Sequence, residues 1–506
     1  RAAPSPTGFV HLGNLVQGLT SERMTHQSGG VLYLRIEDTD AKREVPGAVE
    51  TLIRALSHYH IEFDEGATVD GERGAYGPYR QRQRATIYHV FAKKLVQEGR
   101  AYPCFCTEEE LARMHEEQEA EKANFGYFGR WAVWRDRSLD EIRAAMDAGK
   151  PWVLRFRSEG SIEHKIPFTD LIKGRLELTE NDIDHVLLKS DGIPTYHFAH
   201  AVDDHLMRTT HVVPSLPFHL QLFNALGFRP PKYLHIGPLQ KMDGASKRKL
   251  SKRKDPELAL TFYQAEGYPV DSIYEYLLTI LNSNFEDWRR ANPMLPASEF
   301  RFSYKKMNPA GALFDVMKLR DVSKDVISRM SADTVYREVL AWADEFDREF
   351  AACLGSQPEL ARAALAIGRG GKKPRKDFAL WREVRGYLGF FFDELFQIED
   401  AYPEQFARST IRAALEAFLA TYDPADEQSV WFDKIKAVAG SLGFAADMKA
   451  YRAAPEQYPG SVADVSMFLR IAVTGKQNSP DMFEVMRVLG ETRVRARIAS
   501  MIERLS

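Results

Sequence analysis

The sequence predicts an α/β fold with a doubly wound parallel sheet, an α+β insertion within it, and an all-α C-terminal half. Three observations lead to this prediction. Strand and helix signals alternate through the first hundred residues, the character of the chain changes at about 101–182, and helical periodicity dominates beyond about Leu319. Alternation of strands and helices favours right-handed crossovers between parallel strands, which is a Rossmann-like arrangement.

The first elements are short and closely spaced. An extended segment at residues 1–3 leads into a loop with Pro and Gly at residues 4–8. A helix is expected from about Asn14, and the glycine pair at 29–30 is a good C-terminal signal for it. Residues 31–36 are apolar and β-rich, which is typical of a buried parallel strand.

Two amphipathic helices follow this strand. Apolar residues recur at helical spacing over 49–56 and again over 87–95, where Lys94 interrupts the apolar face of the second helix. The order strand, helix, strand, helix is what a doubly wound sheet requires.

The stretch at 101–182 has a different character, with a charged helix over 108–122 and a short strand at 153–157. We expect an insertion between two halves of the sheet, whose pattern resumes at about 185–226. Beyond it, helices are expected at positions that include 326–346, 359–367 and 410–422. The chain therefore divides into four regions: a Rossmann-like domain at 1–100 and 183–232, an insertion at 101–182, a connecting region at 233–320, and a helical region at 321–506.

Composition sets further limits. A chain of 506 residues is too long for a single core, and 44% hydrophobic with 27% charged residues describes an ordinary globular protein. The net charge of -3 gives no overall basic field, so any nucleic acid must be attracted by local Lys and Arg patches. Three cysteines favour a reducing compartment over a disulfide framework. We expect no membrane span and no signal peptide.

The first chemistry-bearing segment is residues 7–14. Gly8 and Gly13 allow the backbone to approach a ligand, and the N-terminus of the following helix favours phosphate. His11 could donate a hydrogen bond to a phosphate oxygen as charge develops there. On these residues alone, a Gly-rich turn with a surface histidine is the better interpretation.

The second segment, residues 249–253, lies within a basic run at 246–254. A flexible loop of ammonium and guanidinium groups could clamp a triphosphate. A solvated charge run or a nucleic-acid patch is the more common origin of such a segment.

Seven segments, in order along nearly the whole chain, carry a family resemblance: residues 3–8, 11–14, 34–40, 191–199, 202–205, 249–253 and 469–475. Through them the chain resembles the bacterial-type glutamyl-tRNA synthetases, a family of class I aminoacyl-tRNA synthetases. The chain begins at Arg1 within such a motif, so we expect that a native N-terminal stretch is missing.

The resemblance implies roles for individual residues. His11, Asn14, Lys249 and Lys252 would be catalytic, and the ATP-binding set would comprise Thr7, Gly8, His11, Gly13, Asn14, Lys249, Ser251 and Lys252. The glutamate-binding set would comprise Arg1, Ser5, Glu37, Tyr196 and His200, the last at a position where the family often has a different residue. These roles are chemically coherent, because the Arg1 guanidinium suits a carboxylate of the bound glutamate and the Glu37 carboxylate suits its ammonium group. Without the resemblance, Glu37 would be interpreted as a surface acid, and Tyr196 and His200 as packed residues.

The implied activity is that of an ATP-dependent glutamate–tRNA ligase. Glutamate would attack the α-phosphate of ATP, with Mg²⁺ bound to the nucleotide, and the resulting adenylate would be transferred to the 3′-terminal adenosine of tRNA(Glu). The insertion would bind the acceptor end, the region at 233–320 the stem, and the helical region the anticodon. We expect a cytoplasmic monomer. Whether tRNA(Gln) is also charged, and which residues read the anticodon, stay open.

Three departures from the family matter. Asn14 replaces a second histidine, and an amide still donates hydrogen bonds. An Arg-Gly-acidic-acidic-Trp-Leu stretch, expected between Val213 and Pro214, is absent. Because the chain also begins within a motif, we interpret this as a loop skipped in the numbering. A peptide bond between Val213 and Pro214 would instead mean a true deletion. Finally, some family members bind zinc in the insertion, whereas here Cys104 and Cys106 supply only half of such a site and Cys353 is remote. We therefore expect no structural zinc.

A compact basic loop in the helical half is a candidate for contact with RNA phosphates. An ordinary solvated loop is an equally good interpretation. Nearby Phe378 and Trp381 could stack on a base, although core packing is the better expectation for both. The candidate tRNA-binding residues are Arg369, Lys372, Lys373, Arg375 and Lys376.

Several rival functions were weighed. A glutaminyl-tRNA synthetase is disfavoured by the acidic segment at 36–40 and by the helical C-terminal half. A non-catalytic RNA-binding relative is disfavoured because both ATP segments are present. An adenylate-forming enzyme that uses no tRNA would leave the helical half without a purpose.

Overall fold

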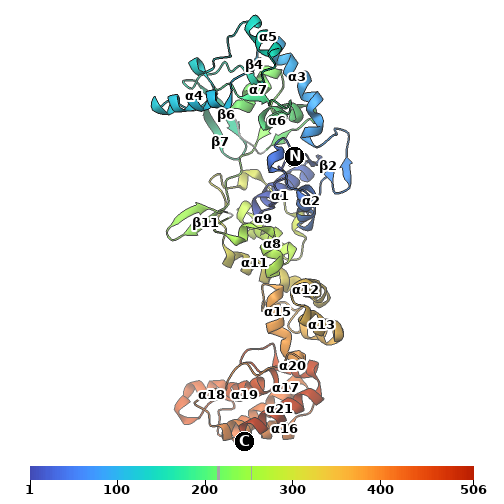
Figure 1. The fold of residues 1–506 in the computed structure, drawn as a ribbon. Helices are drawn as coiled ribbons and strands as arrows, with labels where there is room; N and C mark the ends of the chain where they lie inside the picture. Colours follow the sequence, from blue (N-terminus) through green and yellow to red (C-terminus); the bar gives the residue numbers. More distant parts are fainter. Residues whose placement is uncertain (213–216, 252) are drawn as a thin grey trace. The chain divides into compact units, whose positions relative to one another are not determined.

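The computed structural model describes residues 1–212, 217–251 and 253–506 (Figure 1). The chain forms two compact units. The first comprises Arg1–Leu260 and Leu277–Asp315, and the second comprises Thr261–Tyr276 and Val316–Ser506. Among the described residues, no helix combines the length and the apolar character needed to cross a membrane.

The first unit begins with short parallel strand pairs that alternate with helices. β1 (Tyr33–Leu34) runs parallel to β2 (Glu65–Thr68), which forms an antiparallel hairpin with β3 (Gly71–Arg73). Single parallel bridges join Ala2 to Leu34 and Ile36 to Arg80. The helices of this part are α1 (Leu12–Gln27), α2 (Ala48–His58) and α3 (Ala85–Gln97).

Local chemistry explains these elements. Leu34 and Ile36 pack with Val49 of α2 in a small core beneath the strands. Gly66 has a φ of +113°, and a Cβ there would lie 2.1 Å from the carbonyl oxygen of Leu34, so the close pairing of β1 and β2 needs glycine. Lys94, which interrupts the apolar face of α3, donates to the carbonyl of Leu226 at 3.1 Å.

The chain between α3 and α6 forms an antiparallel sheet with flanking helices. β4 (Ala101–Cys104) pairs with β5 (Val153–Phe156), which also pairs with β8 (Val186–Leu188). α4 (Glu108–Ala120) and α5 (Leu139–Asp147) each begin at a capping box, Thr107 with Glu110 and Ser138 with Glu141. A separate hairpin consists of β6 (Lys165–Asp170) and β7 (Gly174–Thr179).

Two further helices complete the support of the site. α6 (Tyr196–Leu206) and α7 (Phe218–Leu226) share a core with α3, β5 and β8, and its members include Tyr88, Phe156, Phe198 and Leu222. Beside them β9 (His211–Val212) runs parallel to β10 (Lys232–Tyr233). Val213 and Pro214, between which the family stretch was expected, lie outside the described residues.

The predicted parallel sheet is therefore present in part. Strand pairing is parallel at β1–β2, at β9–β10 and at the two single bridges, but the pairs belong to several small sheets of two or three strands. The strand expected over 31–36 is reduced to Tyr33–Leu34, since its flanking residues pair only through single bridges with separate partners or not at all.

After β10 the chain forms a hairpin within the first unit. β11 (Gln240–Asp243) pairs antiparallel with β12 (Ser246–Lys249). The chain continues through the 3₁₀ turn η4 (Pro256–Leu258) into α8 (Leu260–Glu266) and α9 (Val270–Leu281), whose residues Thr261–Tyr276 belong to the second unit, and then into α10 (Phe285–Ala291) of the first unit.

The second unit is built from helices, and its described residues contain no named strand. The helical stretch expected over 326–346 is two helices, because Ser331 caps the second of them with its hydroxyl. The helices are α11 (Val316–Arg329), α12 (Ala332–Phe346), α13 (Arg348–Ser356), α14 (Pro358–Ala366), α15 (Trp381–Leu388), α16 (Arg408–Thr421), α17 (Gln428–Ser441), α18 (Met448–Ala453), α19 (Val462–Thr474), α20 (Met482–Leu489) and α21 (Glu491–Leu505).

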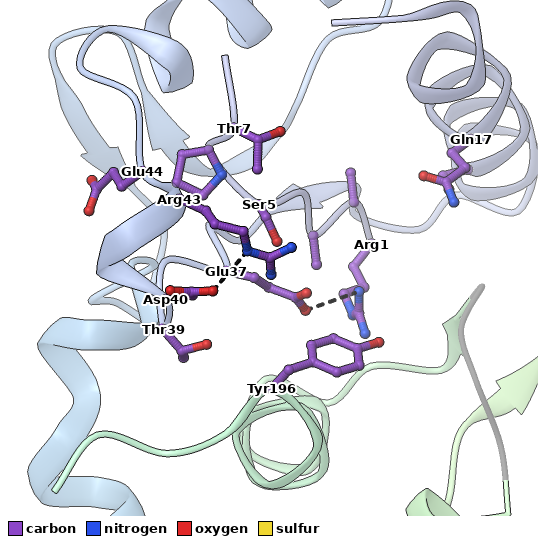
Figure 2. A pocket seen from close by; sticks show the side chains of 14 residues that line it. Arg1, Ser5, Thr7, Gln17, Glu37, Thr39, Asp40, Arg43, Glu44 and Tyr196 are labelled. Atoms are coloured by element: carbon purple, nitrogen blue, oxygen red, sulfur yellow. Dashed lines mark hydrogen bonds and ion pairs between the residues drawn. The ribbon is translucent and has the colours of Figure 1, made fainter. Parts of the chain in front are cut away.

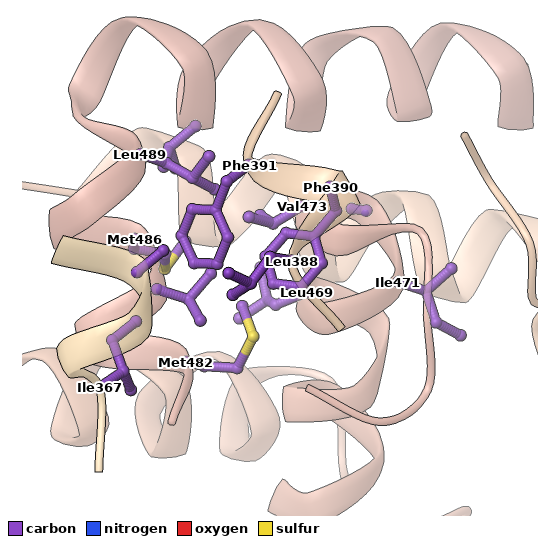
Figure 3. Packing of buried hydrophobic residues seen from close by; sticks show 14 of the residues in the cluster. Ile367, Leu388, Phe390, Phe391, Leu469, Ile471, Val473, Met482, Met486 and Leu489 are labelled. Atoms are coloured by element: carbon purple, nitrogen blue, oxygen red, sulfur yellow. The ribbon is translucent and has the colours of Figure 1, made fainter. Parts of the chain in front are cut away.

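One apolar core runs through this unit. Figure 3 shows Phe390 and Phe391, which follow α15, among side chains of α19 and α20 such as Leu469, Met482 and Met486. Buried Arg497 of α21 donates to the carbonyls of Phe390 and Val473 at 2.7 and 2.9 Å, and thereby ties the last helix to this core. Phe378 and Trp381 are both 3% exposed and are core residues.

Candidate active site

A pocket of about 420 Å³ opens beside the first residues of the chain. Its walls come from four stretches: the N-terminal segment, helix α1, the segment that follows β1, and the first residue of α6 (Figure 2). Charged groups of both signs line it, namely Arg1, Arg43, Glu37, Asp40 and Glu44. A pocket of this kind suits a small ligand that carries both an ammonium group and carboxylates.

The fold brings four of the five predicted glutamate-binding residues to this pocket. Arg1, Ser5, Glu37 and Tyr196 all line it, and Figure 2 shows the Tyr196 ring beside the Arg1 guanidinium and the Glu37 carboxylate. His200 does not line the pocket. It is fully buried, and its Nδ1 lies 2.6 Å from an amino nitrogen of Arg1, so it sits behind the arginine.

Arg1 is held by a buried aspartate. Its Nε donates to Asp204 at 2.8 Å, and its NH2 group donates to the second oxygen of Asp204 at 3.1 Å. The NH1 group lies 4.0 Å from Glu37. One edge of the guanidinium is therefore occupied by Asp204, and NH1 is the part that faces the pocket. NH1 is the group that remains for a substrate carboxylate, because Asp204 holds Nε and NH2, and His200 Nδ1 also lies 2.6 Å from NH2.

A second arginine completes this cluster. Fully buried Arg35 donates to Asp204 at 2.8 Å and to Glu37 at 3.3 Å. Next to Asp204, Asp203 accepts hydrogen bonds from three further side chains, which belong to Gln81, Arg84 and Tyr88. Buried charges of opposite sign are thus paired, as their desolvation requires. Residues 203 and 204 lie within one of the segments that carry the family resemblance, which implied no role for them.

Burial shapes the protonation of these groups. Burial raises the pKa of Glu37 above its ordinary value, although Arg1 and Arg35 oppose the shift. Burial alone would also raise the pKa of Asp204, but the neighbouring cations, Arg1 first, hold that pKa far below its usual range. Burial, opposed in part by Asp204, holds the pKa of His200 well below its ordinary value, so the ring is neutral.

The predicted ATP segment lies on the other side of the same loop. Thr7, Gly8, His11 and Asn14 line a smaller pocket of about 160 Å³ that shares Ser5 and Thr7 with the larger one. His11 is the N-cap of α1: its Nδ1 accepts from the backbone N–H of Asn14 at 3.3 Å, and Asn14 Oδ1 accepts from the N–H of His11 at 3.0 Å. Because Nδ1 is an acceptor, Nε2 is the ring nitrogen of His11 that carries a proton.

This cap explains why the helix begins earlier than expected and why a glycine follows at position 13. The helix begins at Leu12, two residues earlier than expected, because His11 and Asn14 satisfy each other's backbone groups. Gly13 makes room for the His11 ring, since a Cβ there would lie 2.9 Å from two ring atoms.

The basic segment is more ordered than a flexible loop. Residues 246–249 form β12, and Arg248 binds the two oxygens of Asp255 at 2.6 and 2.7 Å. The backbone N–H of Ser251 donates to the same carboxylate at 2.8 Å. Lys249 is exposed, and neither it nor Ser251 lines the two pockets. Lys252 lies outside the described residues.

A backbone contact nevertheless joins the first predicted ATP segment to the part of the chain that follows the second. The chain turns at Ser251, passes through η4, and forms an antiparallel bridge between Ala259 and His11. Residues far apart in sequence are thus neighbours within the first unit.

The cysteines do not form a complete ligand set. Cys106 lies 3.5 Å from the hydroxyl of Tyr127, and Cys104 is buried nearby. Within the part of the chain that the structure describes, no group of three or more His, Cys, Asp or Glu side chains is placed to hold a metal ion. Among the described residues, the two thiols and the phenol of Tyr127 supply at most three of the four ligands of a closed tetrahedral zinc site.

The candidate tRNA-binding loop lies in the second unit. Three of its five cations have partners inside the protein: Arg369 donates to the carbonyl of Ile327 at 2.7 Å, Arg375 binds Asp377 at 2.6 Å, and Lys376 pairs with Asp325. Lys372 and Lys373 are exposed, and the structure gives them no ion pair with any described residue.

Comparisons with known proteins give matches over nearly the whole chain. The family described as "tRNA synthetases class I (E and Q), catalytic domain" matches residues 1–287, and the family described as "Anticodon binding domain" matches residues 378–502. A glutamate–tRNA ligase of Acetivibrio thermocellus is 48% identical over 99% of this chain and 93% of the relative. One of Sorangium cellulosum is 47% identical over 99% of this chain and 94% of the relative.

Solved structures give the same result. A glutamate–tRNA synthetase from Elizabethkingia anophelis matches with a TM-score of 0.78 at 26% identity, over 99% of this chain and 98% of the other. A glutamate tRNA ligase from Elizabethkingia meningosepticum, solved in complex with its amino acid, matches with a TM-score of 0.77 at 25% identity, over 100% and 99% of the two chains.

Proposed function

Since this chain belongs to the class I tRNA synthetases of the glutamate and glutamine type, we propose how the two pockets beside its N-terminal segment divide the work of activating an amino acid. The chain is a glutamate–tRNA ligase, which uses ATP to join glutamate to tRNA. The observation that carries the proposal is that Arg1, Ser5, Glu37 and Tyr196 line one pocket.

The larger pocket is the glutamate site. Glu37 holds the ammonium group, Arg1 meets a carboxylate through NH1, and Ser5 and Tyr196 supply hydroxyl groups at the wall. Among the described residues, the side chain of Glu37 accepts one long bond, from Arg35 at 3.3 Å, and lies 4.0 Å from Arg1, so it retains acceptor capacity for a ligand. His200 belongs to the support of Arg1 and not to the direct contacts.

The smaller pocket and the basic hairpin together form the ATP site. The Nε2 proton of His11 and the side-chain amide of Asn14 are the donors on one flank. Lys249, Ser251 and Lys252 supply the other, while Thr7, Gly8 and Gly13 shape the backbone between the two subsites. The bridge between His11 and Ala259 supports this arrangement because Ala259 follows the basic segment along the chain and pairs with the residue that caps α1.

The chemistry needs no side-chain nucleophile. A carboxylate oxygen of glutamate attacks the α-phosphorus of ATP and pyrophosphate leaves. A ribose hydroxyl of the terminal adenosine then attacks the mixed anhydride and AMP leaves. The protein orients the carboxylate and stabilises the charge that develops on phosphate oxygens. Mg²⁺ accompanies the nucleotide as part of that substrate.

The finer assignments follow from this scheme. The short parallel pairs belong to a Rossmann-like doubly wound sheet at 1–100 and 183–232. The insertion at 101–182 binds the acceptor end, residues 233–320 contact the stem, and residues 321–506 bind the anticodon region of tRNA(Glu). We propose that the enzyme acts as a monomer in the cytoplasm.

The direct test is glutamate-dependent exchange of pyrophosphate into ATP, measured with tRNA(Glu) present. Lys252→Ala and Lys249→Ala should depress kcat strongly while the KM for glutamate changes little, because these lysines bind phosphate and not the amino acid. An equal loss in both parameters would remove the lysines from the ATP site. Aminoacylation of separate tRNA(Glu) and tRNA(Gln) transcripts shows whether the second tRNA is a substrate.

A further inference from the structure

We propose that His200 is a positioning residue for Arg1, and that its Nδ1 is the acceptor that keeps the arginine turned toward the substrate carboxylate. This inference rests on the proposed glutamate site and extends it to a buried side chain that touches no ligand.

The Arg1 guanidinium lies between Glu37 on one side and the pair Asp204 and His200 on the other. On one side, Asp204 takes Nε and one proton of NH2, and His200 Nδ1 takes the other proton of NH2 at 2.6 Å. On the other side, NH1 lies 4.0 Å from Glu37. His200 and Asp204 therefore anchor the guanidinium at a distance from Glu37 that is too long for a hydrogen bond.

This separation matters for binding. If Arg1 moved toward Glu37, the two would form a closed ion pair, and the carboxylate that should receive the substrate ammonium would be occupied by the protein itself. The acceptor at His200 opposes that movement because it satisfies an N–H of Arg1 that would otherwise be unpaired in a buried site.

The histidine itself is costly to bury, which indicates a role. Because Nδ1 accepts from Arg1, the neutral ring carries its proton on Nε2. Nε2 is buried and has no hydrogen-bond partner among the residues that the structure describes. An apolar residue would avoid this unpaired N–H, so the acceptor on the other side of the ring is the feature that the site requires.

A second histidine fixes the ring. His219 of α7 stacks on His200 with ring centroids 4.2 Å apart and an interplanar angle of 26°, and its Nε2 lies 2.9 Å from Nδ1 of His197. The Tyr196 ring lies 5.8 Å away on the pocket side. Packing therefore leaves His200 little freedom to rotate away from Arg1.

Three substitutions separate an acceptor role from a packing role. Asn places its Oδ1 where the histidine has Nδ1, Gln places its oxygen one atom further out, and Leu keeps much of the volume without any acceptor. The readouts are the KM for glutamate, the KM for ATP and kcat in pyrophosphate exchange with saturating tRNA(Glu), together with the melting temperature of each variant.

We expect His200→Asn to keep the wild-type KM for glutamate within about threefold, whereas His200→Gln and His200→Leu should raise it about tenfold, which corresponds to about 1.4 kcal/mol. The KM for ATP should not change. His205→Leu is the matched control on the same helix, because His205 stacks on Phe228 and does not contact the Arg1 cluster.

The outcomes are distinct. An unchanged KM for glutamate in the Gln and Leu variants, or an Asn variant as impaired as Leu, overturns the positioning role. If the Leu variant does not fold, the comparison of Asn with Gln decides the question alone. Absence of glutamate-dependent exchange in the unmodified chain would instead refute the proposed function.

Discussion

The pocket around Arg1 and the basic loop at 369–376 both contain predicted cationic ligand-binding residues, yet the two regions use charge in opposite ways. In the pocket, Asp204 and His200 hold Arg1 by one edge and leave NH1 for a ligand. In the loop, Arg369, Arg375 and Lys376 are satisfied by protein groups. A cation can serve a ligand when its protein partners leave part of it unused, and a count of charges in the sequence does not contain that information.

The largest effect should come from Asp204→Asn, which removes the charge shared by Arg1 and Arg35 while keeping the shape. Two buried arginines would lose their common partner, and breaking a buried ion pair costs about 3–5 kcal/mol. Urea unfolding should show a loss in that range, and glutamate-dependent exchange should fall at least about tenfold.

The matched control is Asp140→Asn, at an exposed aspartate of α5 whose nearest cation is 3.9 Å away. It should leave the unfolding midpoint unchanged. A loss of less than about 1 kcal/mol for Asp204→Asn would mean that the buried cluster does not organise the pocket.

Substitution of the two exposed lysines of the loop should lower the affinity for tRNA and leave the stability of the fold unchanged. Reversing the charge of Lys372 and Lys373 together should weaken the affinity for tRNA(Glu) about tenfold, and should lower the slope of log Kd against log salt by roughly 0.7–0.9 for each lost phosphate contact. Exchange at saturating tRNA should be unchanged.

Arg375→Gln sharpens the contrast within the same loop. Its guanidinium is bound to Asp377, so the substitution should lower the melting temperature and leave tRNA affinity close to the wild-type value. If the Lys372 and Lys373 variant keeps full tRNA affinity, the loop is an ordinary solvated segment.

A smaller effect should appear when pH is varied. Burial raises the pKa of Glu37 above its ordinary value of 4.5, so Glu37 takes up a proton closer to neutrality than an exposed glutamate does. The protonated form cannot pair with the substrate ammonium, so the KM for glutamate should rise as the pH is lowered from about 7.5 towards the ordinary pKa of a glutamate. Glu37→Gln should have a high KM that does not vary over this range. The same slope in both proteins would assign the pH dependence to another group.

The smallest effect concerns His26, whose side-chain exposure is intermediate between that of the buried Arg1 cluster and that of the exposed loop. His26 lies 2.9 Å from Glu22 and 3.0 Å from Asp64, and although burial opposes the shift, these carboxylates raise the pKa of His26 above 6.5. A raised folded-state pKa stabilises the fold fully below the unfolded pKa, and this contribution is lost as pH rises through the folded one. His26→Gln should therefore lower the melting temperature more at about pH 5.5 than at about pH 8. An equal decrease at both values would contradict the ion pairs.

Much of the fold was accessible from local patterns. The helices of the second half and the charged helix of the insertion follow from periodicity and caps, as at Thr107 and Ser331. The division of the strands into small sheets was not accessible, because it depends on which distant residues pair, as with Ile36 and Arg80. One local signal was missed: Gly244, with a φ of +60°, opens the two-residue turn of a hairpin whose second strand lies in the basic run that was expected to be flexible.

In the site, too, some residues could be predicted from the sequence and others depend on contacts between distant segments. Arg1, Ser5, Glu37 and Tyr196 were named from the sequence through family resemblance, and the structure places all four at one pocket. The supporting roles of Asp204 and His200 were not predicted, because they arise from packing of α6 behind the N-terminal segment. Burial and hydrogen-bond partners decide whether such a residue touches the ligand or holds another residue that does.

The most direct test of this account is a crystal structure of the protein with a non-hydrolysable analogue of glutamyl-adenylate. We expect the glutamyl ammonium on Glu37, a carboxylate on NH1 of Arg1, and the phosphate-equivalent group within hydrogen-bonding distance of His11 with Lys249 or Lys252 on its opposite flank. An analogue that binds with its phosphate equivalent remote from His11, or with its ammonium group away from Glu37, would contradict the account.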